Sequence, residues 1–234
     1  MQNKINRQEG HYIICGFGRI GKRVAQELQS RKQAFVILEI DETHLKDIPE
    51  DYLYLEADAT EDQNLIKCGI EKASGLVAVM GSDAANVFTT LSAKELNPGI
   101  KIIAQAAEEK SKEKLKKAGA NKAILTYEIG GYRIVQALLR PTVLEYMDEV
   151  FSRSDIGLEI DEIKIAEGSP IVDKTLADLS LRSELNIIII GIYRSGTEWV
   201  YNPRSETKFH AGDTMIAIGE TSDLLKMEKQ AANA

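Results

Sequence analysis

Cysteine is scarce in this sequence, where Cys15 and Cys68 are the two occurrences among 234 residues. Two cysteines do not make the disulfide framework of a small secreted protein, and neither has the His/Cys spacing of a zinc site. A reducing, cytoplasmic setting is therefore expected. We expect both thiols to be small core residues.

Basic residues are also too few for a protein that binds nucleic acid or an anionic lipid surface. Lysine and arginine total 29 against 36 aspartates and glutamates, which gives a net charge of −7. No apolar run approaches the ~20 residues of a membrane helix. The polar segment Met1–Gly10 lacks the apolar core of a signal peptide. We therefore expect a soluble chain with no nucleic-acid partner.

The first half of the chain alternates between short apolar runs and helical patterns. After Ile20, for example, Val24 and Leu28 continue a four-residue repeat of apolar positions. Strand and helix alternating at this spacing are typical of an α/β fold with a doubly wound parallel (Rossmann) sheet. The predicted strands are His11–Cys15, Ala34–Ile40, Tyr52–Glu56, Leu76–Met80, Ile100–Ala106 and Lys122–Leu125, and two further predicted helices are Asp83–Leu96 and Glu108–Ala118.

The pattern changes after Tyr127. Gly130-Gly131 leads into a predicted helix, Tyr132–Arg140, which stops at Pro141, and Thr142–Ser154 follows as an amphipathic helical connector. The remainder predicts a second, smaller α+β domain. Its predicted elements are strands Leu158–Ile165, Ile187–Tyr193 and Thr214–Ile218, helices Thr175–Leu185 and Ser222–Gln230, and turns at Ser195-Gly196 and Ala211-Gly212-Asp213. The predicted organisation is a linker (1–10), a Rossmann domain (11–140), a helical connector (141–155) and the second domain (156–234).

A glycine-rich loop, Gly16-Phe17-Gly18-Arg19-Ile20-Gly21, joins the first predicted strand to its helix. Gly16 permits the tight turn, Gly18 lets a pyrophosphate approach the backbone, and Gly21 lets the helix pack on the sheet. The helix start offers N–H groups and a positive dipole end to phosphate. Arg19 adds a cation. All six loop residues are therefore candidate nucleotide-binding residues.

An acidic residue, Glu39, ends the second predicted strand at about the ~20-residue distance expected from such a loop. Its carboxylate is placed to accept hydrogen bonds from ribose hydroxyls. It would repel a 2′-phosphate, as would Asp41 and Glu42 nearby. The sequence therefore favours NAD(H), or an adenine nucleotide such as ATP, ADP or AMP, over NADP(H).

Two further groups of residues follow later strands of the same sheet. Asp58 and Ala59 follow the third strand, where the adenine edge would lie, and Ser82, Asp83 and Asn86 open the helix after the fourth. Both groups are candidate binding residues. The alternatives are that Asp58 is a plain turn carboxylate and that Ser82, Asp83 and Asn86 serve helix capping.

Catalytic constellations are lacking. No Tyr-x-x-x-Lys pair occurs, and His11, His44 and His210 are expected to be structural or surface residues. Trp199 is expected to pack. We therefore predict no catalytic residue and no metal site. A divalent cation is conceivable at scattered carboxylates, but solvated faces are the better interpretation of Glu56, Asp58, Glu61, Glu108 and Glu109.

Several short motifs occur in a characteristic order. In the first domain they are the glycine loop with Glu39, Ala57–Thr60, Ser82–Asn86, Ala118–Asn121 and Gly130-Gly131; in the second they are Glu167–Ser169, Lys174–Leu176, Asn202-Pro203 and Ala211–Asp213. This ordered set resembles the RCK (regulator of potassium conductance) domains and the related Trk/Ktr gating subunits. The resemblance extends from about His11 to Lys229, nearly the whole chain.

The resemblance implies a regulatory module at the cytoplasmic face of a membrane. Such domains form homodimers through the helices corresponding to Tyr132–Arg140 and Thr142–Ser154, and often an octameric ring beneath a potassium pore. Met80, Gln105 and Ala107 stand where some calcium-gated members carry acidic residues, which favours a nucleotide ligand. Met1–Glu9 resembles the linker from a pore helix. The chain is expected to be either part of a channel or a free-standing transporter subunit.

The leading hypothesis is therefore a non-enzymatic nucleotide sensor, with an RCK-N domain (11–140) and an RCK-C domain (156–234), that gates potassium flux. Two alternatives stay open. One is a small NAD(H)-dependent oxidoreductase that uses the C-terminal domain as a lid. The other is a transporter partner whose C-terminal domain binds a second ligand, such as a cyclic dinucleotide.

Overall fold

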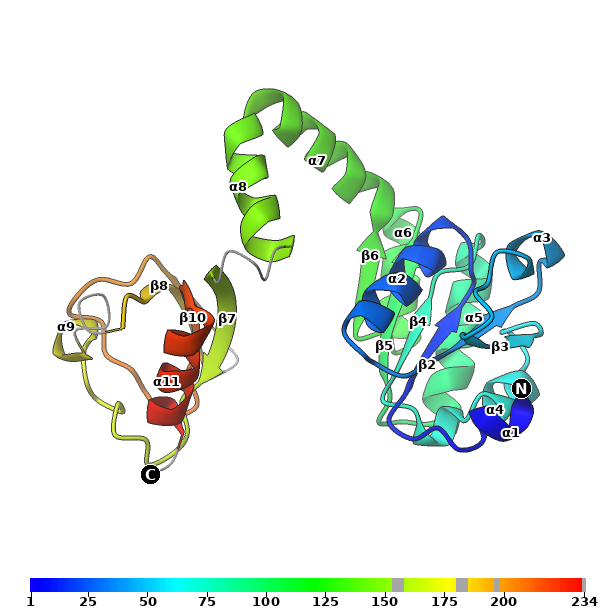
Figure 1. Ribbon diagram of the computed structural model, residues 1–234, viewed down its shortest axis with the longest axis horizontal. Helices are drawn as coiled ribbons and strands as arrows, with labels where there is room; N and C mark the ends of the chain where they lie inside the picture. Colours follow the sequence, from blue (N-terminus) through cyan, green and yellow to red (C-terminus); the bar gives the residue numbers. More distant parts are fainter. Residues whose placement is uncertain (153–157, 180–184, 196–197, 233–234) are drawn as a thin grey trace. The chain divides into compact units, whose positions relative to one another are not determined.

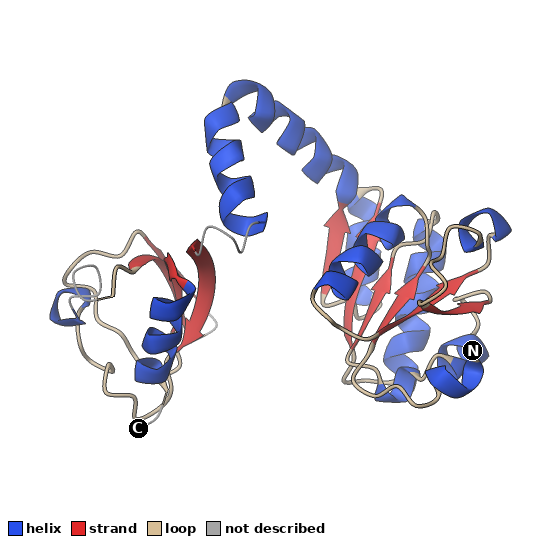
Figure 2. Cartoon of the chain, in the orientation of Figure 1, coloured by secondary structure: helices blue, strands red, loops and turns tan. Residues whose placement is uncertain are grey.

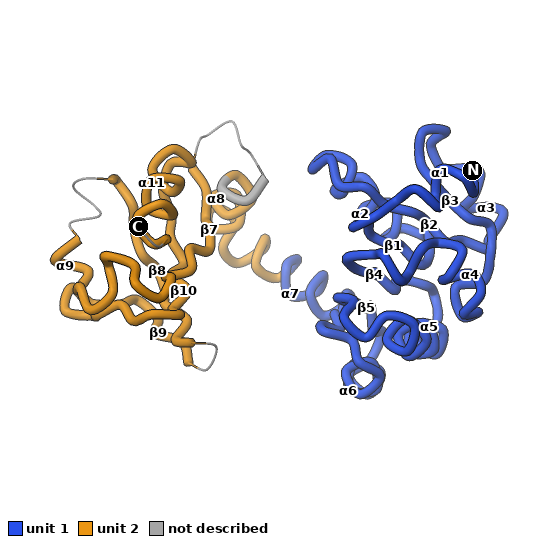
Figure 3. The backbone as a smooth tube through the Cα atoms, turned by 90° about the horizontal axis from the view of Figure 1, so that it is seen from below, with its two compact units in different colours: residues 1–134 blue, residues 135–234 orange. Residues whose placement is uncertain are grey.

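The computed structural model describes residues 1–152, 158–179, 185–195 and 198–232. The chain divides into two compact units, residues 1–134 and 135–234 (Figure 3). No helix in these residues is both long and apolar enough to cross a bilayer.

The first unit is built on a six-stranded sheet in the order β3-β2-β1-β4-β5-β6, with every neighbouring pair parallel. This confirms the predicted Rossmann fold. The strands are β1 (Tyr12–Cys15), β2 (Phe35–Glu39), β3 (Leu53–Glu56), β4 (Gly75–Ala78), β5 (Lys101–Ala106) and β6 (Lys122–Leu125).

Helices cover both faces of this sheet (Figures 1 and 2). On one face, Ile14 and Ile37 pack with Ala25 of α2; on the other, Ile13 and Cys15 belong to a larger core. The apolar runs are continuous because parallel strands bury both faces. The helices are α1 (Gln2–Ile5), α2 (Arg19–Ser30), α3 (Glu42–Leu45), α4 (Asp62–Lys67), the 3₁₀ turn η1 (Ile70–Lys72), α5 (Asp83–Leu96) and α6 (Glu109–Lys117).

The segment after β6 differs from the prediction. Helix α7 (Thr126–Leu139) starts directly at the end of β6, so Gly130-Gly131 lies inside the helix and does not lead into it. Both glycines have a negative φ, and open space surrounds the position that a Cβ would take. Each therefore destabilises the helix by only about 1 kcal/mol relative to alanine. Helix α8 (Pro141–Ser152) follows, where a helical connector was predicted.

The second unit contains a four-stranded antiparallel sheet in the order β7-β10-β8-β9. Its core includes Ile163, Phe209 and Met215, with Leu224 and Met227 from the last helix. This confirms the smaller α+β domain. The elements are β7 (Leu158–Lys164), α9 (Leu176–Leu179), β8 (Ile188–Arg194), β9 (Glu198–Tyr201), β10 (Thr214–Glu220) and α11 (Thr221–Ala231).

Strand β9 was not predicted. It pairs with β8 on the far side of the predicted Ser195-Gly196 turn, and Gly196 lies outside the described residues. The ring of Trp199 packs against those of Tyr193 and Tyr201, with centroid distances of 4.9 and 5.9 Å. Four residues of mixed polarity give too short a pattern to predict a strand. The predicted helix Thr175–Leu185 includes residues 180–184, which also lie outside the described part of the chain.

Candidate functional site

The predicted binding residues meet at the carboxyl ends of four adjacent strands. Strand order reverses between β1 and β4, and doubly wound sheets bind ligands at that point. The glycine loop follows β1, and Glu39 ends β2. Asp58 follows β3, and Ser82 follows β4.

The three loop glycines face different surroundings. Gly16 has φ +100°, and a Cβ there would lie 3.0 Å from the carbonyl oxygen of Val79. A Cβ on Gly21 would lie 2.0 Å from the carbonyl oxygen of Gly16. At Gly18 the nearest atom would be Cε1 of His44, at 3.7 Å. Gly16 and Gly21 are therefore required by the fold, whereas Gly18 leaves space beside the loop.

Helix α2 begins immediately after Gly18, its N-cap, with no side-chain cap at that residue. Arg19 is exposed in the first turn and Ile20 is half-buried, whereas Phe17 is buried. An uncapped helix start presents N–H groups and the positive end of the helix dipole, which attract anions. This end of α2 can therefore bind phosphate.

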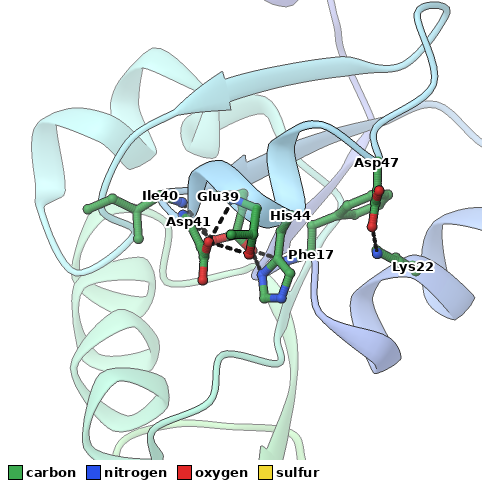
Figure 4. A network of polar contacts seen from close by, with 8 residues as sticks. Phe17, Lys22, Glu39, Ile40, Asp41, His44 and Asp47 are labelled. Carbon is green, nitrogen blue, oxygen red and sulfur yellow. Dashed lines mark hydrogen bonds and ion pairs between the residues drawn. The ribbon is translucent and has the colours of Figure 1, made fainter.

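Glu39 holds the loop in place (Figure 4). Glu39 is buried, with 7% of the residue exposed. Its Oε2 accepts a 2.5 Å hydrogen bond from the backbone N–H of Phe17. Its Oε1 accepts bonds from the backbone N–H groups of Ile40 and Asp41, at 2.7 and 2.8 Å. The predicted ribose acceptor thus also braces the phosphate loop.

His44 lies in the same network, although the sequence indicated only a structural or surface residue. Its Nδ1 is 3.2 Å from Oε2 of Glu39, and the side chain is 38% exposed. Two flanking acidic residues, Asp41 and Asp47, are hydrogen-bonded and ion-paired respectively. The bonds from Thr43 lower the pKa of the Asp41 carboxyl, and the bond from Lys22 lowers that of Asp47. A histidine in a polar turn carries no sequence signal for this contact.

The turn after β3 is held largely by its own polar groups. Oδ1 of Asp58 accepts bonds from the backbone N–H and the hydroxyl of Thr60, at 2.8 and 2.7 Å. Ala59 is buried, and its carbonyl accepts a 2.9 Å bond from the Thr89 hydroxyl. The backbone N–H of Ala57 donates to the carbonyl of Glu39, so this turn lies beside the end of β2.

The residues at the start of α5 also have partners within the protein. Ser82 caps the helix by accepting from the N–H of Ala85 at 3.5 Å, as the capping alternative expected. Asp83 accepts from the N–H of Ala107 at 2.9 Å. The buried Asn86 side chain bonds to the backbone of Met80 and to the carbonyl of Gln105. These contacts tie the carboxyl ends of β4 and β5 together.

The two cysteines and the other two histidines are not among the residues bonded to Glu39, although Cys15 ends β1 directly before the glycine loop. Cys15 and Cys68 are fully buried, and burial raises the pKa of the Cys68 thiol to about 12. His11 is buried with Nε2 2.8 Å from the Cys68 carbonyl oxygen. His210 contacts Arg194 through Nδ1 at 3.1 Å. Over the described ranges, no three His, Cys, Asp or Glu side chains are grouped to hold a metal ion.

Two domain families match the chain. The TrkA-N domain matches residues 12–126 and the TrkA-C domain matches residues 161–232. "Probable potassium channel protein 2" of Methanocaldococcus jannaschii is 37% identical over 97% of this chain and 68% of its own length. "Ktr system potassium uptake protein C" of Bacillus subtilis is 26% identical over 94% of this chain and 96% of its own length.

Solved structures agree with these matches. The GsuK RCK domain is 26% identical with a TM-score of 0.51, and the GsuK channel bound to NAD is 26% identical with a TM-score of 0.50. Each covers 96% of this chain, which spans 47% and 38% of those two chains. GsuK bound to ADP is 25% identical over 56% of this chain and 35% of its own, with a TM-score of 0.51. Since both domains match in order across most of its length, the chain belongs to the RCK family, with a TrkA-N domain followed by a TrkA-C domain.

Proposed function

We propose that this chain senses a nucleotide at the cytoplasmic face of a membrane and gates potassium flux through an associated channel or transporter pore. The observation that carries the proposal is the glycine loop at the start of α2, held by Glu39 where the strand order reverses. The names of the relatives, a potassium channel protein and a potassium uptake protein, support the link to potassium.

The proposed ligand is NAD(H) or an adenine nucleotide. Gly18 and Arg19, with the N–H groups of α2, would bind the phosphates, and Glu39 would accept from the ribose. Asp58 and Ala59 would lie towards the adenine, with Ser82, Asp83 and Asn86 on the other side of the loop. The carboxylates of Glu39, Asp41 and Asp47 disfavour a 2′-phosphate. NAD and ADP in the GsuK structures support this ligand class.

The nucleotide would act as a signal and not as a reactant. A ligand moves a regulatory assembly between two states only through its different affinities for them. The named relatives are potassium transport proteins, which supports a regulatory role over the oxidoreductase hypothesis. No contact in the described residues specifically favours the alternative in which the second domain binds a cyclic dinucleotide.

The assembly would form through α7 and α8, as a homodimer that can build a larger ring. These helices carry large apolar side chains that are about half or more exposed, a surface that soluble monomers rarely leave uncovered. The exposed residues are Tyr127, Ile129, Tyr132, Ile134, Val135, Leu138, Leu139, Val143 and Tyr146.

Gly18→Asp tests the nucleotide site. The new carboxylate would occupy the space where the pyrophosphate approaches the loop, so affinity for NAD⁺, NADH, ATP, ADP or AMP is expected to fall at least about 100-fold. Titration calorimetry and a thermal-shift panel measure the loss. Gly99→Asp is the matched control, because it adds the same charge just before β5, at the amino ends of the parallel strands, whereas the glycine loop lies at their carboxyl ends.

The control variant is expected to bind like the wild type. Unchanged affinity in Gly18→Asp would remove the loop from the proposed site. Failure of the wild-type protein to bind any of the five nucleotides would overturn the sensing function itself.

A further inference from the structure

The carboxylate of Glu39 already has a full set of hydrogen-bond donors. A carboxylate offers about four acceptor positions. The backbone N–H groups of Phe17, Ile40 and Asp41 fill three, and Nδ1 of His44 fills the fourth. A ribose hydroxyl that bonds to this carboxylate must therefore displace one of these donors.

His44 is the donor most easily displaced. The three backbone donors belong to the glycine loop and the end of β2, so they leave only if the loop moves. The His44 bond is the longest of the four at 3.2 Å, against 2.5 to 2.8 Å for the others. The side chain is 38% exposed and stands on α3, a helix of four residues.

The imidazole also lies across the approach to Gly18. Its Cε1 is 3.7 Å from the position that a Cβ on Gly18 would take, while its Nδ1 contacts Glu39. One ring thus lies beside Gly18, where phosphate would approach, and contacts the predicted ribose acceptor. Figure 4 shows the contact with Glu39.

We propose that His44 is a gate on the nucleotide site: it occupies the fourth acceptor position of Glu39 in the free protein, and a ribose hydroxyl replaces it on binding. This inference rests on the proposed nucleotide-sensing function and adds a regulation to it. In the free protein all acceptor positions of the Glu39 carboxylate are then filled, and the nucleotide must compete with the His44 imidazole for one of them.

The gate makes binding sensitive to pH. Histidine is the side chain whose charge ordinarily changes between pH 5 and 8, and a charged donor bonds a carboxylate more strongly than a neutral one. Protonated His44 therefore resists displacement, so nucleotide affinity should fall as the pH falls. By the same linkage, nucleotide binding should release a proton.

The other charged groups around the site do not give nucleotide affinity this pH dependence, because their charges do not change between pH 5 and 8. The pKa values of the Asp41 and Asp47 carboxyls are lowered, by the bonds from Thr43 and from Lys22 respectively, so both stay ionised across that range. Lysine and arginine side chains stay cationic. Glu39 from β2 contacts the imidazole, Asp41 and Asp47 from the α3 segment interact with it electrostatically, and Lys22 from α2 pairs with Asp47. Glu42 and Lys46 flank His44 in the sequence, and Arg19 follows Gly18.

Calorimetry with NAD⁺ between about pH 5.5 and 8 tests the gate, since the NAD⁺ pyrophosphate does not change charge there. Wild-type affinity is expected to fall by up to tenfold per pH unit on the acid side. His44→Ala should bind about three- to tenfold more tightly at pH 6, the value of one hydrogen bond, with a flat pH profile. His44→Gln, which keeps a donor that cannot become charged, should also be flat.

His210→Ala is the matched control, because it removes an exposed histidine in the second unit and should keep the wild-type pH profile. Weaker binding by His44→Ala would make the imidazole a ligand contact and overturn the gate. An unchanged affinity and pH profile would overturn it as well. In both cases wild-type binding leaves the sensing function standing, whereas no binding by the wild type overturns both.

Discussion

The glycines of this chain differ in how closely other atoms pack against them, which the sequence alone does not show. At Gly21 an added Cβ would lie 2.0 Å from a backbone oxygen of Gly16, which belongs to the tight turn after β1. At Gly131, inside α7, nothing lies within 4 Å of the same position. The first glycine is fixed by packing between α2 and the strand, and the second is not.

Gly21→Ala is therefore expected to destabilise the protein by about 1–3 kcal/mol or more, the usual cost of overpacking against a fixed neighbour. Gly131→Ala should instead be neutral or add up to about 1 kcal/mol, because alanine favours a helix interior. Urea unfolding followed by circular dichroism measures both. Equal effects of the two substitutions would contradict the packing argument.

Helix α7 is the element whose apolar side chains are least covered by the rest of its own chain. It has no buried residue among its fourteen, and Leu138 is 80% exposed. A helix that keeps its apolar side chains uncovered in one chain is suited to meet a second chain. This is why pairing is proposed for α7 and α8. Helix α5 also exposes Phe88 and Leu91, but it buries Asn86, Thr89, Thr90 and Ala93, so its place in the first unit does not depend on a second chain.

Leu138→Arg tests this element. A charge at the centre of an apolar contact should weaken association at least tenfold, because it would be buried without a partner. Sedimentation of both proteins across a concentration series measures the change. Leu225→Arg is the matched control, since it alters another exposed leucine on α11. The proposal fails if the wild type is monomeric throughout, or if both variants associate like the wild type.

At the scale of the whole molecule, the two units have separate cores. Ile13 and Leu76 belong to the core of the first unit, and Ile163 and Met215 to that of the second. A nucleotide bound at the proposed site would contact the loops at the carboxyl ends of the first sheet. Its binding free energy should therefore stabilise the first unit directly.

Hydrogen exchange with and without NAD⁺ tests that expectation. At about 100 times its dissociation constant the ligand should add ~2.7 kcal/mol, which slows exchange from the most protected amides about 100-fold. The effect should appear in β1, β2 and β4 and be absent from β7, β8 and β10. Equal protection of both sheets would instead indicate that the units unfold together.

Sequence alone determined the features that depend on neighbouring residues. The parallel sheet followed from the alternation of apolar runs with helical patterns, and the bounds of helix Asp83–Leu96 and strand Lys122–Leu125 were predicted to the residue. The glycine loop was also visible, because each of its requirements is local. The capping role of Ser82 was an alternative at that stage, since a serine before a helical pattern fits either a cap or a ligand contact.

Tertiary structure decided what depends on distant residues. The position of His44 beside Gly18 depends on two segments far apart in the sequence, because the loop after β1 and the segment after β2 meet at the carboxyl ends of these strands. The sequence patterns also did not predict the start of α7 at Thr126, directly after β6, or the pairing of β9 with β8. Both depend on contacts with neighbouring elements. Local patterns thus predicted the glycine loop, whereas only the packing of β1 beside β2 brought the Phe17 N–H to the Glu39 carboxylate and His44 to the side of the loop.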